Sequence, residues 1–437
     1  MSKVVFLTTA ISRCGWNSWL KNEKDFDGMM INHGITHISA NIPKEHNQSL
    51  INLKKCKSWD DYASQLRSSK PDWLLINMYS MDYDYCVIAS KIAKKLFPEI
   101  KIVVGGIHPS VMPDECLEID EFDYIFKGEG EVTLPELIKD NGHGFDRFIV
   151  GVAPDLDKLP YENRDIYPDY ADITDIMPLP TDDMYPPYVD IISARGCPYS
   201  CTFCAPSEQM VFGKKVRQRS LQHVLGELNM LYKRYRFNTL TIHDDMFTLK
   251  KDYIMEFCDM IEMLGWNIKF QCQSRADFVA KNPDIIKRMR EVGLNLINIG
   301  FESGSQKILD FYKKGTKVED NYECARILHE NGIHIFYNVM FCAPTETKED
   351  MLMTSKLIKD TFIPKFDHLS PSVFTPIPGS YLFDYCIKEK LIEINYHLQY
   401  VRYFDSGRKI RGTDYESAAE IVKDLYKWMY ERKDVTP

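Results

Sequence analysis

The 437-residue chain lacks long apolar runs and an excess of positive charge. A membrane-spanning helix needs about 18 consecutive apolar residues, and no run comes near that length. The start of the chain, Met1–Leu7, is strand-like and has none of the three parts of a secretory signal. The formal net charge of −9 argues against a nucleic-acid binder, which ordinarily shows a basic face. We therefore expect a cytoplasmic protein without a membrane or nucleic-acid partner.

The sequence also lacks a disulfide framework. Nine of its twelve cysteines are isolated: Cys14, Cys56, Cys86, Cys116, Cys258, Cys272, Cys324, Cys342 and Cys386. Isolated cysteines in a chain without a secretory signal predict reduced thiols. None of the nine forms a close-spaced metal motif, so a second metal cluster is not indicated.

The other three cysteines stand close together. Cys197, Cys201 and Cys204 have the spacing C-x3-C-x2-C and follow the apolar alternating run Tyr188–Ala194. Thiolates on one short loop can hold three corners of a [4Fe–4S] cluster, which ordinarily takes four protein ligands. A three-cysteine loop leaves one iron open, as a catalytic zinc site leaves one position open.

Two other interpretations of these cysteines are a structural group and half of a zinc site. A zinc site needs a fourth Cys or His at short spacing. The nearest downstream candidates are Cys258 and His223, and His223 lies within an amphipathic helical pattern. The cluster interpretation is therefore favoured.

The segment Cys197-Pro-Tyr-Ser-Cys-Thr-Phe-Cys204 resembles the cluster loop of the radical S-adenosylmethionine enzymes. The resemblance implies a [4Fe–4S] cluster on the three cysteines, with S-adenosylmethionine completing the coordination of the open iron. It also implies that Phe203, just before the third cysteine, packs against adenine. An external one-electron reductant of the flavodoxin or ferredoxin type would reduce the cluster.

The first 150 residues alternate short apolar runs with helical patterns. The expected strands are Lys3–Thr8, Ile35–Ala40, Trp73–Asn77, Lys101–Val104 and Asp123–Phe126. The expected helices are Ser58–Arg67, Tyr85–Phe97 and Glu131–Asp140. This alternation predicts an α/β fold, with residues 1–150 as a doubly wound, Rossmann-like domain. Ligands of such sheets bind beyond the carboxyl ends of the strands.

Three segments at expected strand ends carry small or polar residues: Asn77–Ser80, Val104–Ser110 and Lys127–Glu131. A Gly-Gly pair alone often marks only a tight turn. In their order along the chain and in their residue types, however, the three segments resemble the cobalamin-binding domain that precedes the radical domain in one large class of the superfamily. The resemblance implies cobalamin contacts from Ser80, Gly105, Gly106, Gly128 and Glu129.

The D-x-H-x-x-G motif that supplies a histidine to cobalt in other cobalamin proteins is missing. None of the eleven histidines has an aspartate two residues before it. We therefore expect cobalamin to bind without a histidine ligand, its lower side facing the loop Thr8–Trp16, which offers Arg13, Cys14 and Trp16. A domain that keeps the fold and has lost the cofactor is the alternative.

Residues 151–187, with seven prolines and little periodicity, predict an irregular surface linker. Residues 188–390 then show six strand–helix units, three quarters of an eight-unit barrel. The strands are Tyr188–Ala194, Thr239–Asp244, Ile268–Cys272, Asn295–Phe301, Ile333–Phe341 and His368–Phe374; the helices are Ser220–Tyr235, Lys251–Leu264, Pro283–Glu291, Glu319–Asn331, Lys348–Thr361 and Tyr381–Glu389. Residues 391–437 form a helical extension, in which amphipathic Glu416–Glu431 covers one side.

Five polar or Gly-rich segments follow the later barrel strands: Ile242–Thr248, Gln271–Asp277, Ile299–Ser305, Phe341–Thr347 and Thr375–Ser380. In the same order they resemble the S-adenosylmethionine-binding strand ends of the superfamily. The residues implied are Gln273, Arg275, Glu302, Ser303 and Asn338. The Arg275 fork suits the methionyl carboxylate, and Glu302 suits the ammonium or a ribose hydroxyl.

For several of these residues, a purely structural role is an alternative. Arg275 can form a surface ion pair with Asp277, and Ser303 can cap a helix. Asp244 and Asp245 are candidates either to face the substrate and position solvent, or to cap a helix.

The chain is thus expected to be a cobalamin-dependent radical S-adenosylmethionine enzyme that methylates an unactivated carbon of a small-molecule substrate. A cyclase or ring-rearrangement enzyme that transfers no methyl group is an alternative. A non-catalytic cobalamin or cluster sensor is a second alternative, although a sensor would not need Arg275 or Glu302.

Overall fold

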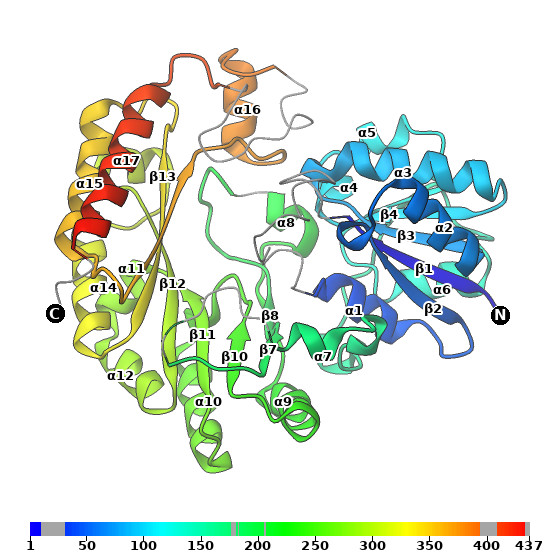
Figure 1. The fold of residues 1–437 in the computed structure, drawn as a ribbon, viewed down its shortest axis with the longest axis horizontal. Helices are drawn as coiled ribbons and strands as arrows, with labels where there is room; N and C mark the ends of the chain where they lie inside the picture. Colours follow the sequence, from blue (N-terminus) through cyan, green and yellow to red (C-terminus); the bar gives the residue numbers. More distant parts are fainter. Residues whose placement is uncertain (10–30, 176–180, 182, 205–206, 394–408, 433–437) are drawn as a thin grey trace.

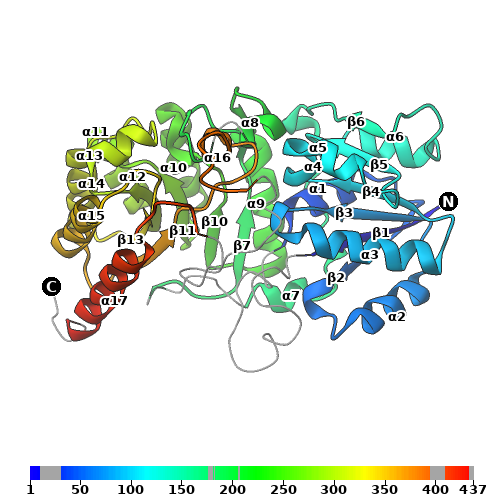
Figure 2. The same ribbon diagram turned by 90° about the horizontal axis from the view of Figure 1, so that it is seen from above.

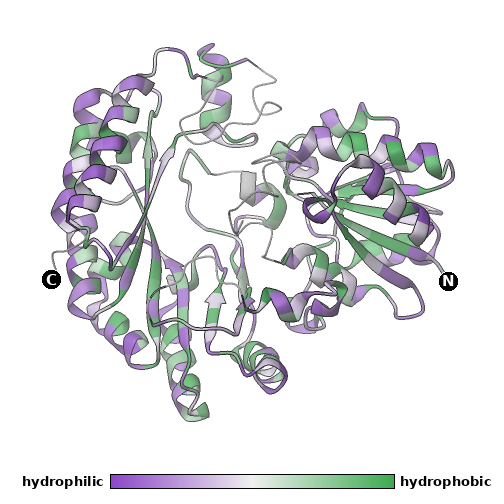
Figure 3. Ribbon diagram, viewed as in Figure 1, coloured by the Kyte–Doolittle hydropathy of each residue, from purple (hydrophilic) through white to green (hydrophobic). Residues whose placement is uncertain are grey.

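Two parallel six-stranded sheets, each with its own helices, form two lobes that lie side by side (Figures 1 and 2). The computed structural model describes residues 1–9, 31–175, 181, 183–204, 207–393 and 409–432. Apolar residues gather along the strands and polar residues on the outer faces of the helices (Figure 3). Among the described residues, no helix is both long and apolar enough to cross a membrane.

The first lobe is a doubly wound α/β domain with strand order β2-β1-β3-β4-β5-β6, all parallel. Its strands are β1 (Lys3–Thr8), β2 (Asn47–Asn52), β3 (Trp73–Asn77), β4 (Lys101–Gly105), β5 (Tyr124–Lys127) and β6 (Phe148–Val150). Its helices are α1 (His33–Asn41), α2 (Trp59–Ser69), α3 (Tyr83–Leu96), α4 (Ile107–Val111), α5 (Pro113–Leu117) and α6 (Thr133–Lys139).

The strands of this lobe are apolar on both faces. In β1, Val5 and Leu7 join the core on one face, and Val4 and Phe6 join the core on the other. Helices cover both faces, as parallel sheets require. The expected fold class is therefore confirmed for this lobe.

One expected strand is wrong. Residues 35–40 lie in helix α1, which Asn32 caps by accepting a hydrogen bond from the Ile35 N–H at 3.0 Å. The β-branched residues in this stretch suggest a strand, but its buried side chains pack as one face of a helix, and tertiary packing overrides propensity. The true second strand, β2, lies at the sheet edge, and its largely polar sequence gives little signal.

The second lobe is a crescent of six parallel strands in the order β14-β13-β12-β11-β10-β7. The strands are β7 (Tyr188–Ile191), β10 (Thr239–Ile242), β11 (Lys269–Ser274), β12 (Leu294–Glu302), β13 (His334–Phe341) and β14 (His368–Val373). All six expected strands are present, which confirms the partial barrel.

Helices pack against the outer face of the crescent and share one large apolar core with its strands. They are α9 (Leu221–Tyr235), α10 (Lys251–Leu264), α11 (Ala276–Lys281), α12 (Pro283–Glu291), α14 (Val318–Glu330) and α15 (Lys348–Thr361). The expected C-terminal helix is present as α17 (Tyr415–Glu431), and it packs beside α15, where Lys359 Nζ lies 2.6 Å from Asp424 Oδ2.

Shorter elements surround the open end of the crescent. A two-stranded antiparallel ribbon, β8 (Ala194–Arg195) with β9 (Arg217–Gln218), encloses the cysteine loop and α8 (Ser207–Phe212). Two further short helices are α13 (Gln306–Phe311) and α16 (Tyr381–Lys388).

The segment between the lobes is more buried than expected. It contains the 3₁₀ turns Leu156–Lys158 and Arg164–Ile166 and the short helix α7 (Tyr170–Ile173). Ile166, Tyr167 and Tyr170 enter the core of the first lobe. The described part of the segment is thus packed into the protein and does not merely run along its surface.

Candidate active site at the carboxyl ends of the barrel strands

The three clustered cysteines line one cavity at the open end of the crescent. Cys197, Cys201 and Cys204 follow β8, and the cavity they line has a volume of about 440 Å³. Small-molecule and cofactor sites are commonly about 300–1,000 Å³. The space therefore suits a cluster with a ligand of the size of S-adenosylmethionine.

Most of the residues predicted for this site line the same cavity. Besides the cysteines these are Phe203, Asp245, Gln273, Arg275, Glu302 and Asn338. They come from the cysteine loop and from β10, β11, β12 and β13, whose carboxyl ends meet at one edge because the strands are parallel. Asp244 and Ser303 are not among the lining residues.

Arg275 lies in the cavity wall beside the cysteine loop and is buried. Its Nε donates to Asp277 at 2.9 Å, one terminal nitrogen donates to the Lys314 carbonyl at 2.6 Å, and the other lies 3.9 Å from Cys201 Sγ. The predicted pair with Asp277 exists but is buried rather than on the surface. Arg275 therefore links the cysteine loop to the chain after α13.

Lys314 is a lining residue that the sequence did not reveal. Its Nζ lies 2.7 Å from Glu302 Oε1 and 5.8 Å from the centre of the Phe203 ring, and both members of the ion pair are buried. The only sequence signal is a Lys-Lys-Gly-Thr turn after α13, which looks like an ordinary exposed turn.

Glu302 itself has a strained backbone, with a φ of 62° at the end of β12. The β12–β13 register shifts at this point. Non-glycine residues held in this left-handed region are enriched at functional sites. The strain turns the Glu302 carboxylate toward the cavity that it lines.

Asp244 has a different surrounding from the one predicted. It is buried, and it accepts hydrogen bonds from the Ser193 N–H at 2.6 Å, from the Ala194 N–H at 2.9 Å and from the Ser193 hydroxyl. Burial, only partly offset by these hydrogen bonds, raises the pKa of Asp244 to about 6. The carboxylate fastens the chain before the cysteine loop to β10 and does not face the cavity.

Ser303 is also engaged elsewhere. It is fully buried, with its hydroxyl 3.1 Å from that of Thr354, and it accepts a hydrogen bond from the Ser305 N–H at 3.0 Å. Its hydroxyl therefore holds the turn after β12, and only its neighbour Glu302 reaches the cavity.

A second cavity lies at the carboxyl edge of the first sheet. It has a volume of about 60 Å³ and is lined by Phe6, Leu75, Phe126, Leu134 and several glycines, including Gly105, Gly106 and Gly128. Three of the five residues predicted to contact cobalamin thus lie together. A Cβ on Gly105 would touch only the Phe126 Cβ, at 3.6 Å, so bare backbone lines a narrow apolar slot there.

The other two predicted cobalamin contacts, Ser80 and Glu129, do not line this cavity. The Ser80 hydroxyl lies 3.0 Å from Nδ1 of His108. Glu129 is buried and pairs with Arg195 at 2.5 Å and with Arg217. Of the loop predicted to face the lower side of cobalamin, residues 10–16 lie outside the described residues.

The ion pair between Glu129 and Arg195 joins the two lobes. Arg195 stands two residues before Cys197, and its NH1 also lies 2.7 Å from Glu131 Oε1. Burial alone would raise the pKa of Glu131, but the charges of Arg195 and His37 hold it below its ordinary value. We call Glu129, Glu131, Arg195 and Arg217 the interlobe clamp.

A second polar group joins the lobes through the segment between them. Glu162 and Arg164 of that segment contact His33 of α1 and Asp190 of β7. Burial would lower the pKa of His33, but the charges of Glu162 and Asp190 outweigh burial and raise the pKa to about 10. The first lobe is therefore fixed to the barrel at two separate places.

Two family models match the chain in the regions of these two cavities. Residues 26–138 match the B12 binding domain, and residues 191–358 match the radical SAM superfamily. The first match contains the glycine-lined cavity apart from Phe6, and the second contains four of the six barrel strands, β10 to β13.

Two curated relatives are similar to the chain. An uncharacterized methyltransferase of Pyrococcus horikoshii is 28% identical over 422 residues, which cover 92% of this chain and 88% of that protein. An anaerobic magnesium-protoporphyrin IX monomethyl ester cyclase of Cereibacter sphaeroides is 28% identical over 342 residues, 75% of this chain. This chain spans only 55% of the length of that cyclase.

Two solved structures share the fold. The cobalamin-dependent S-adenosylmethionine radical enzyme OxsB superposes with a TM-score of 0.66 at 19% identity over 98% of this chain and 62% of its own. The radical S-adenosylmethionine methyltransferase TsrM from Kitasatospora setae gives a TM-score of 0.64 at 18% identity, over 89% of this chain and 79% of its own. The chain therefore contains a B12 binding domain followed by a domain of the radical SAM superfamily.

Proposed function

We propose that the protein methylates an unactivated carbon of a small-molecule substrate, with cobalamin in the glycine-lined cavity and S-adenosylmethionine in the cysteine-lined cavity. The observation that carries the proposal is the pairing of these two cavities, since the clamp residue Arg195 joins the first lobe two residues before the cysteine loop. When bound, the cofactors supply hydrogen-atom abstraction from an unreactive carbon and a methyl group for it.

The protein residues bind and orient these groups. Cys197, Cys201 and Cys204 would hold three irons of a [4Fe–4S] cluster, and Asp244 fixes the chain that leads into their loop. The buried guanidinium of Arg275 lies beside Cys201 and would position the loop.

The buried Lys314–Glu302 pair suits the charged end of S-adenosylmethionine. Its carboxylate would bind between Lys314 and Arg275, and its ammonium would bind Glu302. Phe203 and Asn338, which line the same cavity, would contact the adenosyl part, with Gln273 beside Arg275. Asp245 remains for the substrate, and Ser303 has no direct part in this arrangement.

For cobalamin, the backbone at Gly105, Gly106 and Gly128 would accept the nucleotide tail. Among the described residues, no histidine lines this cavity, which supports binding without a histidine ligand to cobalt. We further propose a cytoplasmic setting, in which a flavodoxin or ferredoxin supplies the electron.

Methyl transfer is preferred to cyclisation because of how the relatives align. The methyltransferase relative aligns over nearly the full length of both chains, whereas the cyclase is covered for only 55% of its length. A cobalamin-dependent cyclase or ring-rearrangement enzyme without methyl transfer is the second candidate.

Product analysis tests the proposal. The protein is purified anaerobically with hydroxocobalamin, reconstituted, and supplied with S-adenosylmethionine, a reductant and candidate substrates. Methylation predicts S-adenosylhomocysteine and 5′-deoxyadenosine in equal amounts, together with a product heavier by one methylene group. 5′-Deoxyadenosine without S-adenosylhomocysteine would favour the cyclase, and the absence of any bound corrinoid would exclude both.

Cys201→Ala is the matched control, because it removes one corner ligand of the cluster. It should hold less than a full complement of iron and release no 5′-deoxyadenosine. If this variant still bound four irons and cleaved S-adenosylmethionine, the assignment of the loop would be wrong.

A further inference from the structure

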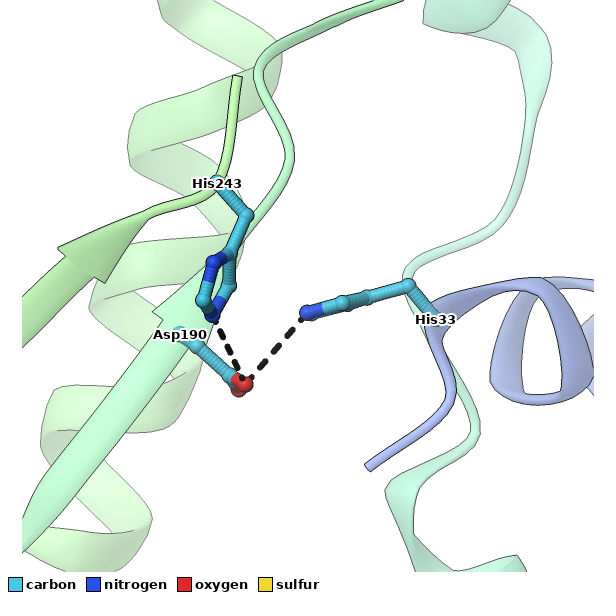
Figure 4. A group of neighbouring side chains, drawn as sticks. All are labelled: His33, Asp190 and His243. Carbon is cyan, nitrogen blue, oxygen red and sulfur yellow. Dashed lines mark ion pairs between the residues drawn. The ribbon is translucent and has the colours of Figure 1, made fainter. Parts of the chain in front are cut away.

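Three side chains that commonly bind metals meet where the first lobe contacts the barrel (Figure 4). His33 begins α1, Asp190 lies on β7, and His243 directly follows β10. Nε2 of His33 lies 3.3 Å from Asp190 Oδ2, and Nε2 of His243 lies 3.6 Å from the same oxygen. The three ligand atoms are all within 4.8 Å of one another.

These spacings are close to those of a bound metal ion. Bonds of about 2.0–2.2 Å in a tetrahedral site place neighbouring ligand atoms roughly 3.3–3.5 Å apart. The two distances to Asp190 Oδ2 already fall within about 0.1 Å of that range. The third distance, between the two imidazole nitrogens, is at most 4.8 Å, so the imidazoles would have to close on the ion to complete the site.

Neighbouring residues orient the ligands. His33 Nδ1 lies 2.9 Å from both oxygens of Glu162, so its Nε2 points away from Glu162 and toward Asp190. Asp190 Oδ1 accepts a hydrogen bond from Arg164 at 2.8 Å, which leaves Oδ2 for the two histidines. A carboxylate on the far nitrogen of a ligand histidine is the usual support of protein metal sites.

The facing nitrogen of His33 is ion-paired with Asp190 but not hydrogen-bonded by any described residue. Within the part of the chain that the structure describes, this buried Nε2 makes no hydrogen bond, although Asp190 Oδ2 lies 3.3 Å away. A buried polar atom without a hydrogen bond calls for an explanation, such as an ion. The side chains are 11%, 16% and 22% exposed for His33, Asp190 and His243, so the position is enclosed but accessible.

We propose that His33, Asp190 and His243 bind one divalent metal ion of the class that takes imidazole and carboxylate ligands, zinc or iron(II). Two histidines and one carboxylate leave coordination positions open, as in mononuclear iron(II) and catalytic zinc sites. None of the three residues lines the cysteine cavity, so this centre is separate from the cluster. Its ligands come from both lobes, and the ion would therefore join them.

The proposed metal site lies next to both cofactor cavities. His33 is followed by Gly34, which lines the glycine cavity, and His243 is two residues before Asp245, which lines the cysteine cavity. The ion would thus lie between the two cofactor cavities, where a water on an open position faces the joint. The competing arrangement is a metal-free ion-pair network of the same residues.

Metal binding to the reconstituted full-length protein distinguishes the two arrangements. The cluster occupies Cys197, Cys201 and Cys204, so equilibrium dialysis with Zn²⁺ measures sites outside the cysteine loop. We expect one zinc per chain in the unmodified protein and in His368→Ala, a half-buried histidine of the barrel that serves as a control. His243→Ala, which removes a partly exposed ligand, is expected to bind Zn²⁺ at least about 100-fold more weakly.

A second variant acts on the supporting residue. Glu162→Gln keeps the size of the side chain and is expected to weaken zinc binding about 10–100-fold. Mössbauer spectra after iron reconstitution test the iron(II) alternative, in which a high-spin iron(II) signal beside the cluster would be absent from His243→Ala. If the unmodified protein retains neither metal, or His243→Ala retains as much as the unmodified protein, the metal-free network is correct and the proposal is wrong.

Discussion

At the scale of single residues, the Arg275 guanidinium has all three nitrogens engaged, with Asp277, the Lys314 carbonyl and the sulfur of Cys201 as neighbours. The central carbon of the guanidinium, Cζ, also lies 3.9 Å from the centre of the Tyr199 ring. A single lysine ammonium cannot reach these partners together, because it lacks the planar fork. Arg275 is thus both a part of the cavity wall and a candidate ligand for the cosubstrate.

We expect Arg275→Lys to lower the free energy of unfolding by about 1–3 kcal/mol, since buried partners lose their hydrogen bonds. The same loss should weaken S-adenosylmethionine binding about tenfold or more. Urea denaturation and equilibrium dialysis measure the two effects. Arg288→Lys, at an arginine that pairs with Asp259 and Glu262 outside the cavity, should change neither. Unchanged stability and affinity in Arg275→Lys would contradict the assignment.

The stability of the folded protein is expected to depend on pH through Glu346, which lies in the turn after β13. Burial, only partly offset by the Ala343 N–H, raises the pKa of Glu346 to about 7. The folded protein therefore binds more protons than the unfolded chain between about pH 4.5 and pH 7. Stability from this group is complete below that interval and is lost as the pH rises through it.

Glu346→Gln removes this titration. The stability of the unmodified protein relative to the variant should fall by about 3 kcal/mol between pH 4.5 and pH 7. Urea denaturation of the cofactor-free proteins at several pH values measures the difference. Glu349→Gln, three residues further on and exposed, is the control and should show no such change. A constant difference for Glu346→Gln would refute the raised pKa.

The sequence predicted residues that face the cavity better than residues that support it. The cysteine spacing is a local pattern, so the loop could be identified without a structure. Lys314 could not, because its meeting with Glu302 depends on how a turn after α13 folds back over the cavity. The sequence leaves a substrate-facing and a structural role open for both Asp244 and Asp245; in the structure Asp244 holds the backbone of Ser193 and Ala194, and Asp245 lines the cavity.

At the scale of secondary structure, long periodic segments were predictable and short edge elements were not. All six barrel strands were expected close to their observed bounds, because buried parallel strands are continuous apolar runs. β2 and β6 were missed, since β2 is polar at a sheet edge and β6 has only three residues. The sequence of α1 favours a strand because its β-branched residues outweigh the single helical signal of its capping residue, Asn32.

The end of β4 offers a clean test of cobalamin binding. Gly105 lines the cavity, and an added Cβ there makes only an ordinary contact, so Gly105→Val should fold while filling the slot. We expect the variant to lose bound cobalamin while its iron content stays unchanged. Visible spectra and metal analysis measure both quantities, and Gly105→Ala should have a smaller effect. Undiminished cobalamin in Gly105→Val would place the cofactor elsewhere.

The neighbouring glycine is a poorer choice for this experiment. Gly106 has a φ of 102°, and an added Cβ would lie 2.6 Å from Asn77 Oδ1. Substitution there strains the backbone whatever the ligand. Loss of cobalamin from a Gly106 variant would therefore not distinguish a blocked cavity from a damaged fold.

At the scale of the whole molecule, the interlobe clamp is expected to make the two lobes unfold as one cooperative unit. Glu129 and Glu131 of the first lobe are almost fully buried against Arg195 and Arg217 of the barrel. Removing one member of a buried ion pair leaves its partner uncompensated, at a cost of about 3–5 kcal/mol. Glu129→Gln should therefore weaken the contact between the lobes more than it destabilises either lobe by itself.

We expect calorimetry of Glu129→Gln to show a lower first transition and separate unfolding of the two lobes. Asp165→Asn provides the control, because its pair with Arg234 is exposed on both sides and should contribute less than about 1 kcal/mol. A single transition at the original temperature in Glu129→Gln would show that the lobes are held together by other contacts.

The clamp also limits how this architecture can be rearranged. Arg195 belongs to the barrel by sequence, but both of its carboxylate partners belong to the first lobe. A chimaera that joins this barrel to the first lobe of a relative would bury an arginine without its acids unless the new lobe supplies both carboxylates. The two halves are therefore expected to be inherited and exchanged as matched pairs, with acid and base substituted together or not at all.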